Sequence, residues 1–215
     1  MTVSLNIREI CVFSCAPVVN RKRCRQFEIF PARRRRQDEI IRKGNNLRVI
    51  HLTFYKCASQ WVRDILTDSE VISVSGFPLS AGGIDVASEG WPNVPSDSFA
   101  GPLYGASYEN WSENAADDDR AIVVLRDPRD LVISLVFSLG FSHVPSSMTR
   151  LLRSPISAAS DRDRVRIGIF LLTQWADRMR SWGTAPPGNR EYVTSYQRLT
   201  SHPKEEFGAI CRFLG

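Results

Sequence analysis

A lysine, a serine and a tryptophan follow the apolar run 47–52 at close spacing, within the segment TFYKCASQW of residues 53–61. A strand that ends in such a loop and leads into a helix can bind an anion, because the helix N-terminus presents unpaired N–H groups and the positive end of its macrodipole. The Gly-rich spacing of a Walker A loop is absent. The alternative is a surface turn followed by an amphipathic helix that packs on the core. We predict a phosphate-binding loop made of Lys56 for charge, Cys57 and Ala58 for the turn, Ser59 and Gln60 as donors, and Trp61 as a face for a base.

A second loop with a basic residue follows the apolar run 121–125. Five consecutive apolar residues, most of them β-branched, predict a strand that is covered on both faces. Asp127 and Pro128 then predict a helix start, because aspartate caps the first turn and the fixed φ of proline suits the first helical position. Arg126 would therefore lie at the carboxyl end of a strand, where open α/β sheets bind their ligands. The alternative is a capped helix whose Arg129 is solvated.

Together, the two segments resemble the phosphate-binding motifs of the sulfotransferase family. Its 5′-phosphosulfate loop has the form T-x-P-K-[ST]-G-[ST]-[ST]-W, and four residues here match it: Thr53, Lys56, Ser59 and Trp61. Among the positions that depart from it, Tyr55 replaces the proline, Ala58 the glycine and Gln60 the second hydroxyl residue. Its 3′-phosphate motif, R-[ND]-P-x-[DE]-x-x-x-S, is met at every specified position from Arg126 to Ser134. By this resemblance, Arg126 and Ser134 bind the 3′-phosphate of a donor nucleotide.

The last part of the chain resembles a third family segment, Y-E-D-L followed by a helix that ends in F-L-G. Residues 191–195 are typical of a strand, and the apolar spacing of residues 204–214 predicts a helix with one buried face. Tyr196 matches the tyrosine of the motif, whereas its two acids are replaced. In the family this tyrosine lies near the adenine, so the resemblance implies that Tyr196 contacts the cofactor. A core tyrosine is the alternative.

The resemblance implies an α/β domain with three layers, α/β/α, and a mainly parallel sheet, similar to the sulfotransferase branch of the P-loop-NTPase-like folds. It implies transfer of a sulfuryl group from 3′-phosphoadenosine-5′-phosphosulfate (PAPS) to a hydroxyl or amine of a small-molecule or glycan acceptor. Lys56 would neutralise the leaving oxygen, while the N–H groups and side chains at Ser59 and Gln60 hold the 5′-phosphate. Such a transfer mainly requires positioned reactants and stabilised charge. It requires no metal.

The sequence departs from the family in two further places: the general base and the basic loop that closes over the nucleotide. Many family members use a histidine from between the two phosphate motifs as general base. None is present there, and the carboxylates that could replace it are Glu89, Glu109 and Glu113. The family also continues past F-L-G into a basic loop that closes over the 3′-phosphate, whereas this sequence ends at Gly215. We therefore expect a short version of the domain, a truncated product or a lid supplied by a partner. The alternative functions are an inactive nucleotide-binding module and a small-molecule kinase of related fold.

The charge pattern divides the chain into a basic extension, residues 1–46, and a nearly neutral domain, residues 47–215. Residues 20–36 hold eight cations and one acid, whereas the rest of the chain holds 20 basic and 22 acidic residues. Such runs are most often solvated, disordered tails, so nucleic-acid binding is not expected. Within the domain, apolar residues at three- or four-residue spacing between 167 and 182 predict a helix packed on the core.

The five cysteines are scattered, with no C-x-x-C spacing and no nearby histidine that would indicate a metal site. An odd, scattered set fits a reducing interior better than a disulfide framework, so a cytoplasmic protein is expected. No stretch reaches the ~20 apolar residues that a membrane span requires. Cys57 lies in the anion-binding loop at a helix start, where the pKa of its thiol should be lowered.

Residues 76–119 are rich in glycine, proline, serine and acids, and they show little periodicity. Long irregular segments in compact domains are usually lids or binding loops, or else they are disordered. The segment also holds five aromatic residues: Trp91, Phe99, Tyr104, Tyr108 and Trp111. We therefore expect an irregular loop whose rings form part of an acceptor pocket.

Overall fold

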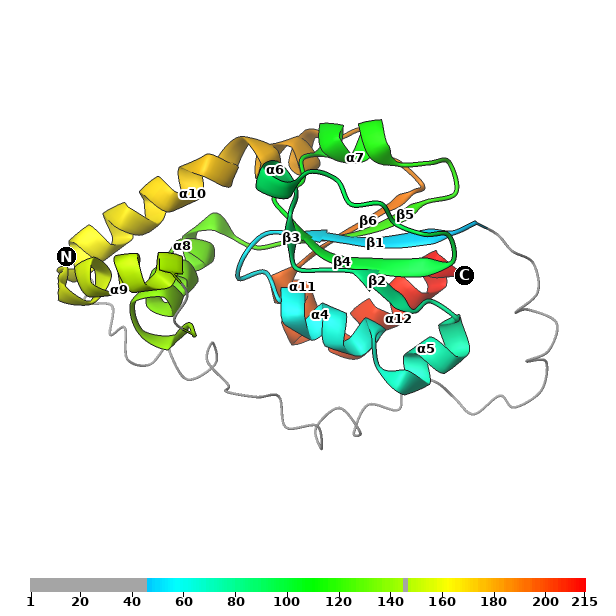
Figure 1. The fold of residues 1–215 in the computed structure, drawn as a ribbon, viewed down its shortest axis with the longest axis horizontal. Helices are drawn as coiled ribbons and strands as arrows, with labels where there is room; N and C mark the ends of the chain where they lie inside the picture. Colours follow the sequence, from blue (N-terminus) through cyan, green and yellow to red (C-terminus); the bar gives the residue numbers. More distant parts are fainter. Residues whose placement is uncertain (1–45, 145–146) are drawn as a thin grey trace.

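A parallel sheet of six strands forms the centre of the computed structural model, which describes residues 46–144 and 147–215 (Figure 1). The predicted extension therefore lies outside the described residues, except for its last position. In chain order the strands are β1 (Arg48–Thr53), β2 (Leu79–Ala81), β3 (Ile84–Asp85), β4 (Ser98–Tyr104), β5 (Arg120–Leu125) and β6 (Glu191–Ser195). They are arranged β2-β4-β1-β5-β6, β3 also pairs with β4, and every pairing is parallel. The predicted parallel sheet is confirmed.

Helices cover both faces of the sheet, which gives the three layers expected from the sequence (Figure 1). One face carries α4 (Ser59–Leu66), α5 (Ser69–Ser75), α11 (Tyr196–Ser201) and α12 (Pro203–Leu214). The other carries α6 (Val86–Glu89), α7 (Tyr108–Asn114) and the last part of α10 (Asp161–Thr184). A helical extension projects beyond the carboxyl ends of the strands: α8 (Pro128–Phe137), a π-helical turn (Ser138–Ser142), α9 (Ser147–Ala158) and the first part of α10. Within the described ranges, no helix combines the length and the apolarity that a bilayer span requires.

The elements beside the second phosphate motif form as the sequence predicts. The apolar run becomes β5, and four of its consecutive residues are fully buried. Asp127 caps α8, because its carboxylate accepts a 2.9 Å hydrogen bond from the N–H of Arg129, and Pro128 occupies the first helical position. Strand and helix are therefore separated by two residues only, which holds Arg126 at the edge of the sheet.

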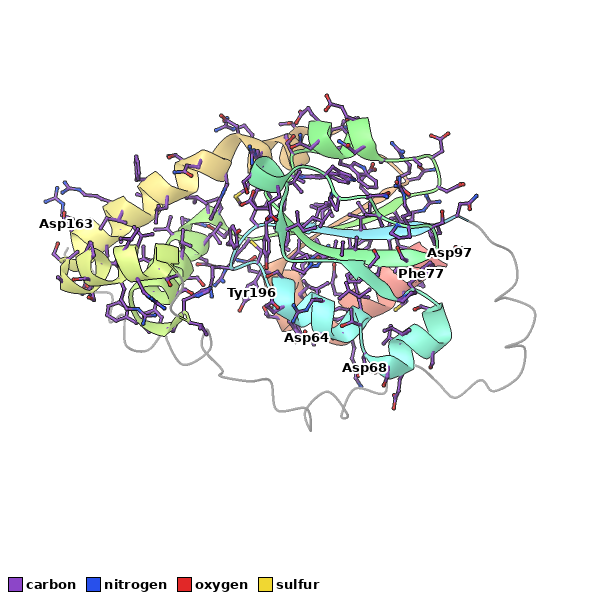
Figure 2. The ribbon with its side chains drawn as sticks, viewed as in Figure 1. Asp64, Asp68, Phe77, Asp97, Asp163 and Tyr196 are labelled. Carbon is purple, nitrogen blue, oxygen red and sulfur yellow. The ribbon has the colours of Figure 1, made fainter. Side chains whose placement is uncertain are left out.

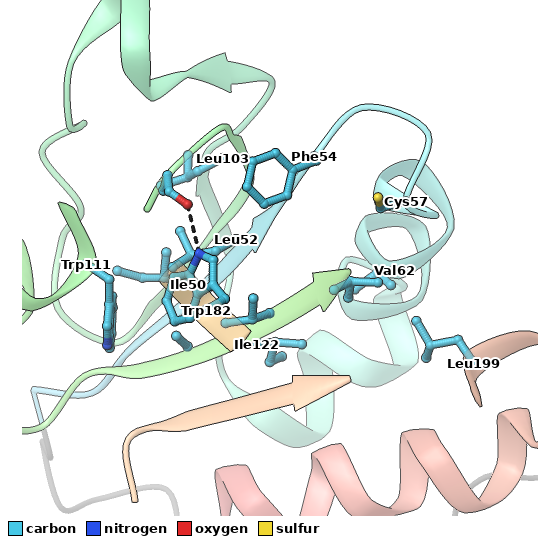
Figure 3. Packing of buried hydrophobic residues seen from close by; sticks show 14 of the residues in the cluster. Ile50, Leu52, Phe54, Cys57, Val62, Leu103, Trp111, Ile122, Trp182 and Leu199 are labelled. Atoms are coloured by element: carbon cyan, nitrogen blue, oxygen red, sulfur yellow. Dashed lines mark hydrogen bonds between the residues drawn. The ribbon is translucent and has the colours of Figure 1, made fainter. Parts of the chain in front are cut away.

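One hydrophobic core lies between the sheet and the helices on both faces (Figure 3). Ile50 of β1 and Ile122 of β5 are fully buried at its centre, and Val62 of α4 closes one side. On the other side Trp182 of α10 is buried, and its indole N–H donates to the carbonyl of Ala106 at 2.8 Å. The predicted packing of the 167–182 helix on the core is confirmed for its last turns.

The prediction of an irregular segment over residues 76–119 is wrong, because this segment contains β4, a central and fully buried strand. Gly101 and Pro102 hid the strand, since both residue types are unfavourable inside a central strand. The closeness of β1 explains the glycine: a Cβ on Gly101 would lie 2.6 Å from the Cβ of His51. The pairing of β4 with β1 shifts register at this place, so Pro102, which has no N–H to donate, lies at an irregularity of the ladder.

His51 of β1 is fully buried, and neither of its ring nitrogens has a hydrogen-bond partner among the described residues. Burial lowers the pKa of this imidazole to about 3, because the charged form would lose its hydration. His51 is therefore neutral near pH 7 and forms part of the core.

Candidate functional site

The carboxyl ends of four neighbouring strands bring the predicted binding residues to one edge of the sheet. The loop with Lys56 follows β1, and Tyr104 ends β4. Arg126 follows β5, and Tyr196 follows β6. Because β1 lies between β4 and β5, the strand order reverses direction beside it. Open parallel sheets bind ligands in the crevice at such a switch point, so this edge is the candidate site.

The loop between β1 and α4 turns through two residues in the left-handed conformation, Lys56 with a φ of 70° and Ala58 with a φ of 63°. Ala58 is the N-cap residue of α4 and has no side-chain acceptor for the N–H groups of the first turn. That turn also contains no acid. The N-terminus of α4 therefore has no side-chain cap, and its N–H groups can donate to an anion.

We expect Ala58→Gly to raise the free energy of unfolding by about 0.5–1 kcal/mol. The left-handed conformation costs an alanine roughly 1–2 kcal/mol, and the greater freedom of glycine in the unfolded chain offsets part of that gain. Unfolding in guanidinium chloride at an unchanged m-value would measure the difference. Ala209→Gly, inside α12, is the matched control and should lower stability by about 1 kcal/mol. A loss of stability in both variants would show that Ala58 is not strained.

Arg126 is held between the loop and the end of β6. Its Nη1 donates to the carbonyl oxygen of Lys56 at 2.8 Å, and its guanidinium carbon lies 4.0 Å from the ring centroid of Tyr196. Tyr196 is the first residue of α11, directly after β6 (Figure 2). The Nε atom of Arg126 is buried and has no hydrogen-bond partner in the described part of the chain. The guanidinium is thus fixed on two sides while one of its donors stays unpaired.

Ser134 is a second buried group without a partner. It lies in α8 and is 6% exposed, and its Oγ makes no hydrogen bond within residues 46–144 and 147–215. Buried polar atoms are nearly always hydrogen-bonded, and leaving one unpaired costs about 1–3 kcal/mol. The unpaired Nε of Arg126 and Oγ of Ser134 therefore indicate a place for a ligand with accepting oxygens.

Tyr104 connects β4 to the loop through contacts that no sequence pattern indicated. Its hydroxyl donates to Ser59 Oγ at 3.0 Å and accepts a hydrogen bond from Gln60 Nε2 at 3.2 Å. Its ring stacks on Tyr55, with 4.3 Å between the centroids and 9° between the planes. The sequence predicts an irregular segment around Tyr104, and only the pairing of β4 with β1 brings this residue to the loop.

The predicted acceptor pocket made partly of aromatic rings stays a prediction, although two of the rings belong to the core. Trp111 and Phe99 are fully buried in it. Tyr108 meets Trp182 of α10 edge-on, with 5.5 Å between the ring centroids. Tyr104 is the member of the group that contacts the loop.

A cavity of about 360 Å³ lies beside Arg126, between the end of β5, the start of α8 and α10. Mostly apolar side chains line it: Leu125, Arg126, Pro128, Leu172, Ala176, Met179 and Arg180. Sites for small organic ligands usually measure roughly 300–1,000 Å³, so this cavity is large enough for one. It adjoins the loop, because Arg126 lines the cavity and also bonds the backbone of Lys56.

The expected lowering of the Cys57 pKa is wrong. The side chain is fully buried, and burial raises the pKa of the thiol to about 12, although the charge of Arg126 acts in the opposite direction. Its backbone N–H donates to the carbonyl of Phe54 at 3.2 Å, which closes the turn of the loop. Cys57 is therefore a protonated core residue near pH 7, and its thiol is no nucleophile.

Trp61 and the three candidate bases lie on helices. Trp61 is half-buried on α4, where its ring meets Phe207 of α12 edge-on at 5.5 Å. Glu89 ends α6, and its carboxylate accepts a 2.9 Å bond from the backbone at the start of the same helix. Glu109 and Glu113 are exposed on α7. The stacking of Trp61 on a base and the role of any of these acids as general base stay predictions.

One solved structure that resembles the fold is that of mouse sulfotransferase SULT7A1 complexed with PAP, with a TM-score of 0.53 and 14% sequence identity. The likeness covers 79% of this chain and 59% of that one, so this chain spans less than two thirds of the mouse protein. At this identity the comparison establishes the fold. No curated protein matches the sequence.

The family model of the sulfotransferase domain matches residues 108–215. This half of the chain includes Arg126, Ser134 and Tyr196, and the loop with Lys56 precedes it. The fold agrees with the match, because it resembles that of a solved sulfotransferase. The chain belongs to the sulfotransferase domain family.

Proposed function

We propose that this chain binds PAPS and transfers its sulfuryl group to a hydroxyl or amine of a small-molecule or glycan acceptor. The observation that carries the proposal is the pair of buried groups, Arg126 Nε and Ser134 Oγ, that lack partners among the described residues. They occupy the two positions at which the family binds a 3′-phosphate, the group that distinguishes PAPS from ordinary adenosine phosphates. Phosphate oxygens would pair with both groups through charge-assisted hydrogen bonds. The residues present therefore fit this nucleotide.

The loop between β1 and α4 is the proposed site of the 5′-phosphate. The uncapped first turn of α4 offers backbone N–H groups, and Ser59 and Gln60 add side-chain donors. Lys56 would stabilise the negative charge that grows on the leaving phosphate oxygen during transfer. Tyr196 and Trp61 are the proposed contacts of the adenine.

The chain needs no covalent intermediate for this reaction. PAPS, when bound, supplies an activated sulfuryl group, so the protein must align the acceptor with it and stabilise the departing phosphate. The buried Cys57 thiol is consistent with a reaction that has no covalent intermediate, because burial raises the pKa of this thiol to about 12 and keeps it protonated.

The cavity beside Arg126 is the proposed site of the acceptor. Its walls are mostly apolar, from Leu125, Leu172 and Met179. Apolar surface gains roughly 25 cal/mol per Å² when it leaves water, so this cavity favours an acceptor whose hydroxyl or amine is carried on a carbon skeleton. Because the cavity adjoins the loop through Arg126, an acceptor there would lie next to Lys56.

We expect the protein to bind 3′-phosphoadenosine 5′-phosphate (PAP) at least about tenfold more tightly than 5′-AMP. A hydrogen bond to a charged group contributes roughly 1.5–3 kcal/mol, and 5′-AMP lacks the phosphate that Arg126 would bind. Calorimetric titration of both nucleotides measures the ratio. Equal affinities would contradict the proposed function.

The same titrations on two arginine variants locate the effect. Arg126→Ala should abolish the preference for PAP over 5′-AMP. Arg129→Ala is the matched control, because Arg129 belongs to the same motif but is exposed and paired with Asp127. Arg129→Ala should leave the ratio of the PAP and 5′-AMP affinities unchanged within about twofold, because substitutions at independent sites usually change each other's effects by no more than that. A preference that survives in Arg126→Ala would assign the 3′-phosphate to another cation.

A further inference from the structure

Three side chains form a chain of hydrogen bonds: Gln60 and Ser59 at the start of α4, and Tyr104 at the end of β4. Gln60 Nε2 can only donate, so the Tyr104 hydroxyl must accept from it at 3.2 Å. The proton of Tyr104 is then directed to Ser59 Oγ, which accepts it at 3.0 Å. Ser59 and Tyr104 are 7% and 6% exposed, so little water competes for the bond between them, whereas Gln60 is exposed.

We propose that Tyr104 is a positioning residue that turns the Ser59 hydroxyl into a dedicated donor for the 5′-phosphate of the nucleotide. An oxygen that already accepts from Tyr104 must direct its own hydrogen away from that bond, which leaves this hydrogen available to a phosphate. The preceding donor, Gln60, polarises the Tyr104 hydroxyl and strengthens the next bond in the series. This inference rests on the proposed function, since it assumes that a phosphate is bound at the loop.

The inference gives a reason for one departure from the family loop. Gln60 stands where the family has a second hydroxyl residue, and a hydroxyl could either donate or accept. In this structure the amide nitrogen of Gln60 donates to the Tyr104 hydroxyl, which leaves the Tyr104 proton for Ser59. The combination of Gln60 with Tyr104 thus fixes the orientation of Ser59 before any ligand arrives, which reduces the reorganisation that binding requires.

Tyr104→Phe tests the inference, because it removes the hydroxyl and keeps the ring that stacks on Tyr55. Three nucleotides are titrated by calorimetry: PAP, 5′-AMP and 3′-AMP. The affinities for PAP and 5′-AMP should fall roughly three- to tenfold, the range set by one neutral hydrogen bond. The affinity for 3′-AMP should stay within about twofold, because this ligand has no 5′-phosphate. An equal loss for all three ligands, or no loss for PAP and 5′-AMP, would overturn the inference.

Tyr55→Phe is the matched control. It removes the hydroxyl from the other ring of the stacked pair. That hydroxyl donates to Asp85 at 3.3 Å and takes no part in the hydrogen bonds between Gln60, Tyr104 and Ser59. All three affinities should be unchanged. A loss of PAP and 5′-AMP binding equal to that of Tyr104→Phe would show that any hydroxyl lost from this pair disturbs the loop, and it would overturn the inference.

A double variant keeps the test decisive if Tyr104→Phe lowers stability. In a Ser59→Ala background, Tyr104→Phe should cause no further loss of affinity for 5′-AMP, since Tyr104 would act only through Ser59. Additive losses would overturn the inference. The proposed function is judged separately, by the preference of the unchanged protein for PAP over 5′-AMP, so either idea can fail alone.

Discussion

Lys56→Ala is expected to lower the turnover of PAPS with an acceptor by about 10²–10³, the scale on which loss of one preorganised donor acts elsewhere. The charge that Lys56 meets is larger in the transition state than in the bound substrate, so the rate should fall further than the affinity for PAP. The backbone should not change, because alanine is as strained as lysine at the φ of 70° found here. Single-turnover rates and calorimetric affinities on the same variant separate the two effects.

Lys204→Ala is the matched control, because Lys204 is exposed on α12. It should leave both the rate and the affinity unchanged. If Lys56→Ala retained normal turnover, its catalytic assignment would be wrong. If only the affinity fell, Lys56 would attract the donor without assisting its chemistry. An unchanged protein that binds PAP but turns over no acceptor would instead favour an inactive nucleotide-binding module.

His51 should make the protein progressively less stable as the pH falls from about 6.5 to about 3. Burial lowers its pKa to about 3, whereas an unfolded histidine titrates near 6.5. Between these values the unfolded state binds a proton that the folded state does not, so the free energy of unfolding decreases by about 1.4 kcal/mol per pH unit. Above pH 6.5 this contribution is fully present, and its complete loss amounts to roughly 4–5 kcal/mol.

Urea unfolding at a series of pH values measures this dependence. The quantity compared between variants is the slope of the free energy of unfolding against pH, not the absolute stability. His51→Leu should reduce this slope by about 1.4 kcal/mol per pH unit, the contribution of one proton. The contribution of the carboxylates to the slope should remain. His143→Gln, at an exposed position, is the matched control for replacing a histidine. Equal slopes for His51→Leu and the unchanged protein would mean that the buried ring titrates normally.

The parts of the fold that the sequence predicted are those with strong local signals. The apolar run before Arg126 and the Asp127–Pro128 pair determine where β5 ends and α8 begins. These signals act within a few residues, so one sequence is enough to recognise them. The loop before α4 was predicted in the same way, from its lysine, its serine and the strand that precedes it.

The parts that the sequence did not predict depend on contacts between distant segments. The strand β4 carries Gly101 because β1 leaves no room for a Cβ there, and this reason is visible only in the folded sheet. Tyr104 reaches the loop through the same pairing. The thiol of Cys57 was expected to respond to the helix N-terminus, but the core that surrounds it has the larger effect. In each case burial by a remote element outweighed the local pattern.

The central position of β1 has a consequence for the synthesis of the chain. The partners of β1 are β4, which begins at Ser98, and β5, which begins at Arg120. At about 5–20 residues per second, the roughly 70 residues that separate Val49 from its partner Arg120 take on the order of 4–14 s to be made. Throughout that time at least one edge of an apolar strand has no neighbour, and unpaired edges are templates for aggregation. The strand that carries the phosphate loop is therefore exposed to aggregation for several seconds of synthesis, during which chaperones would protect it.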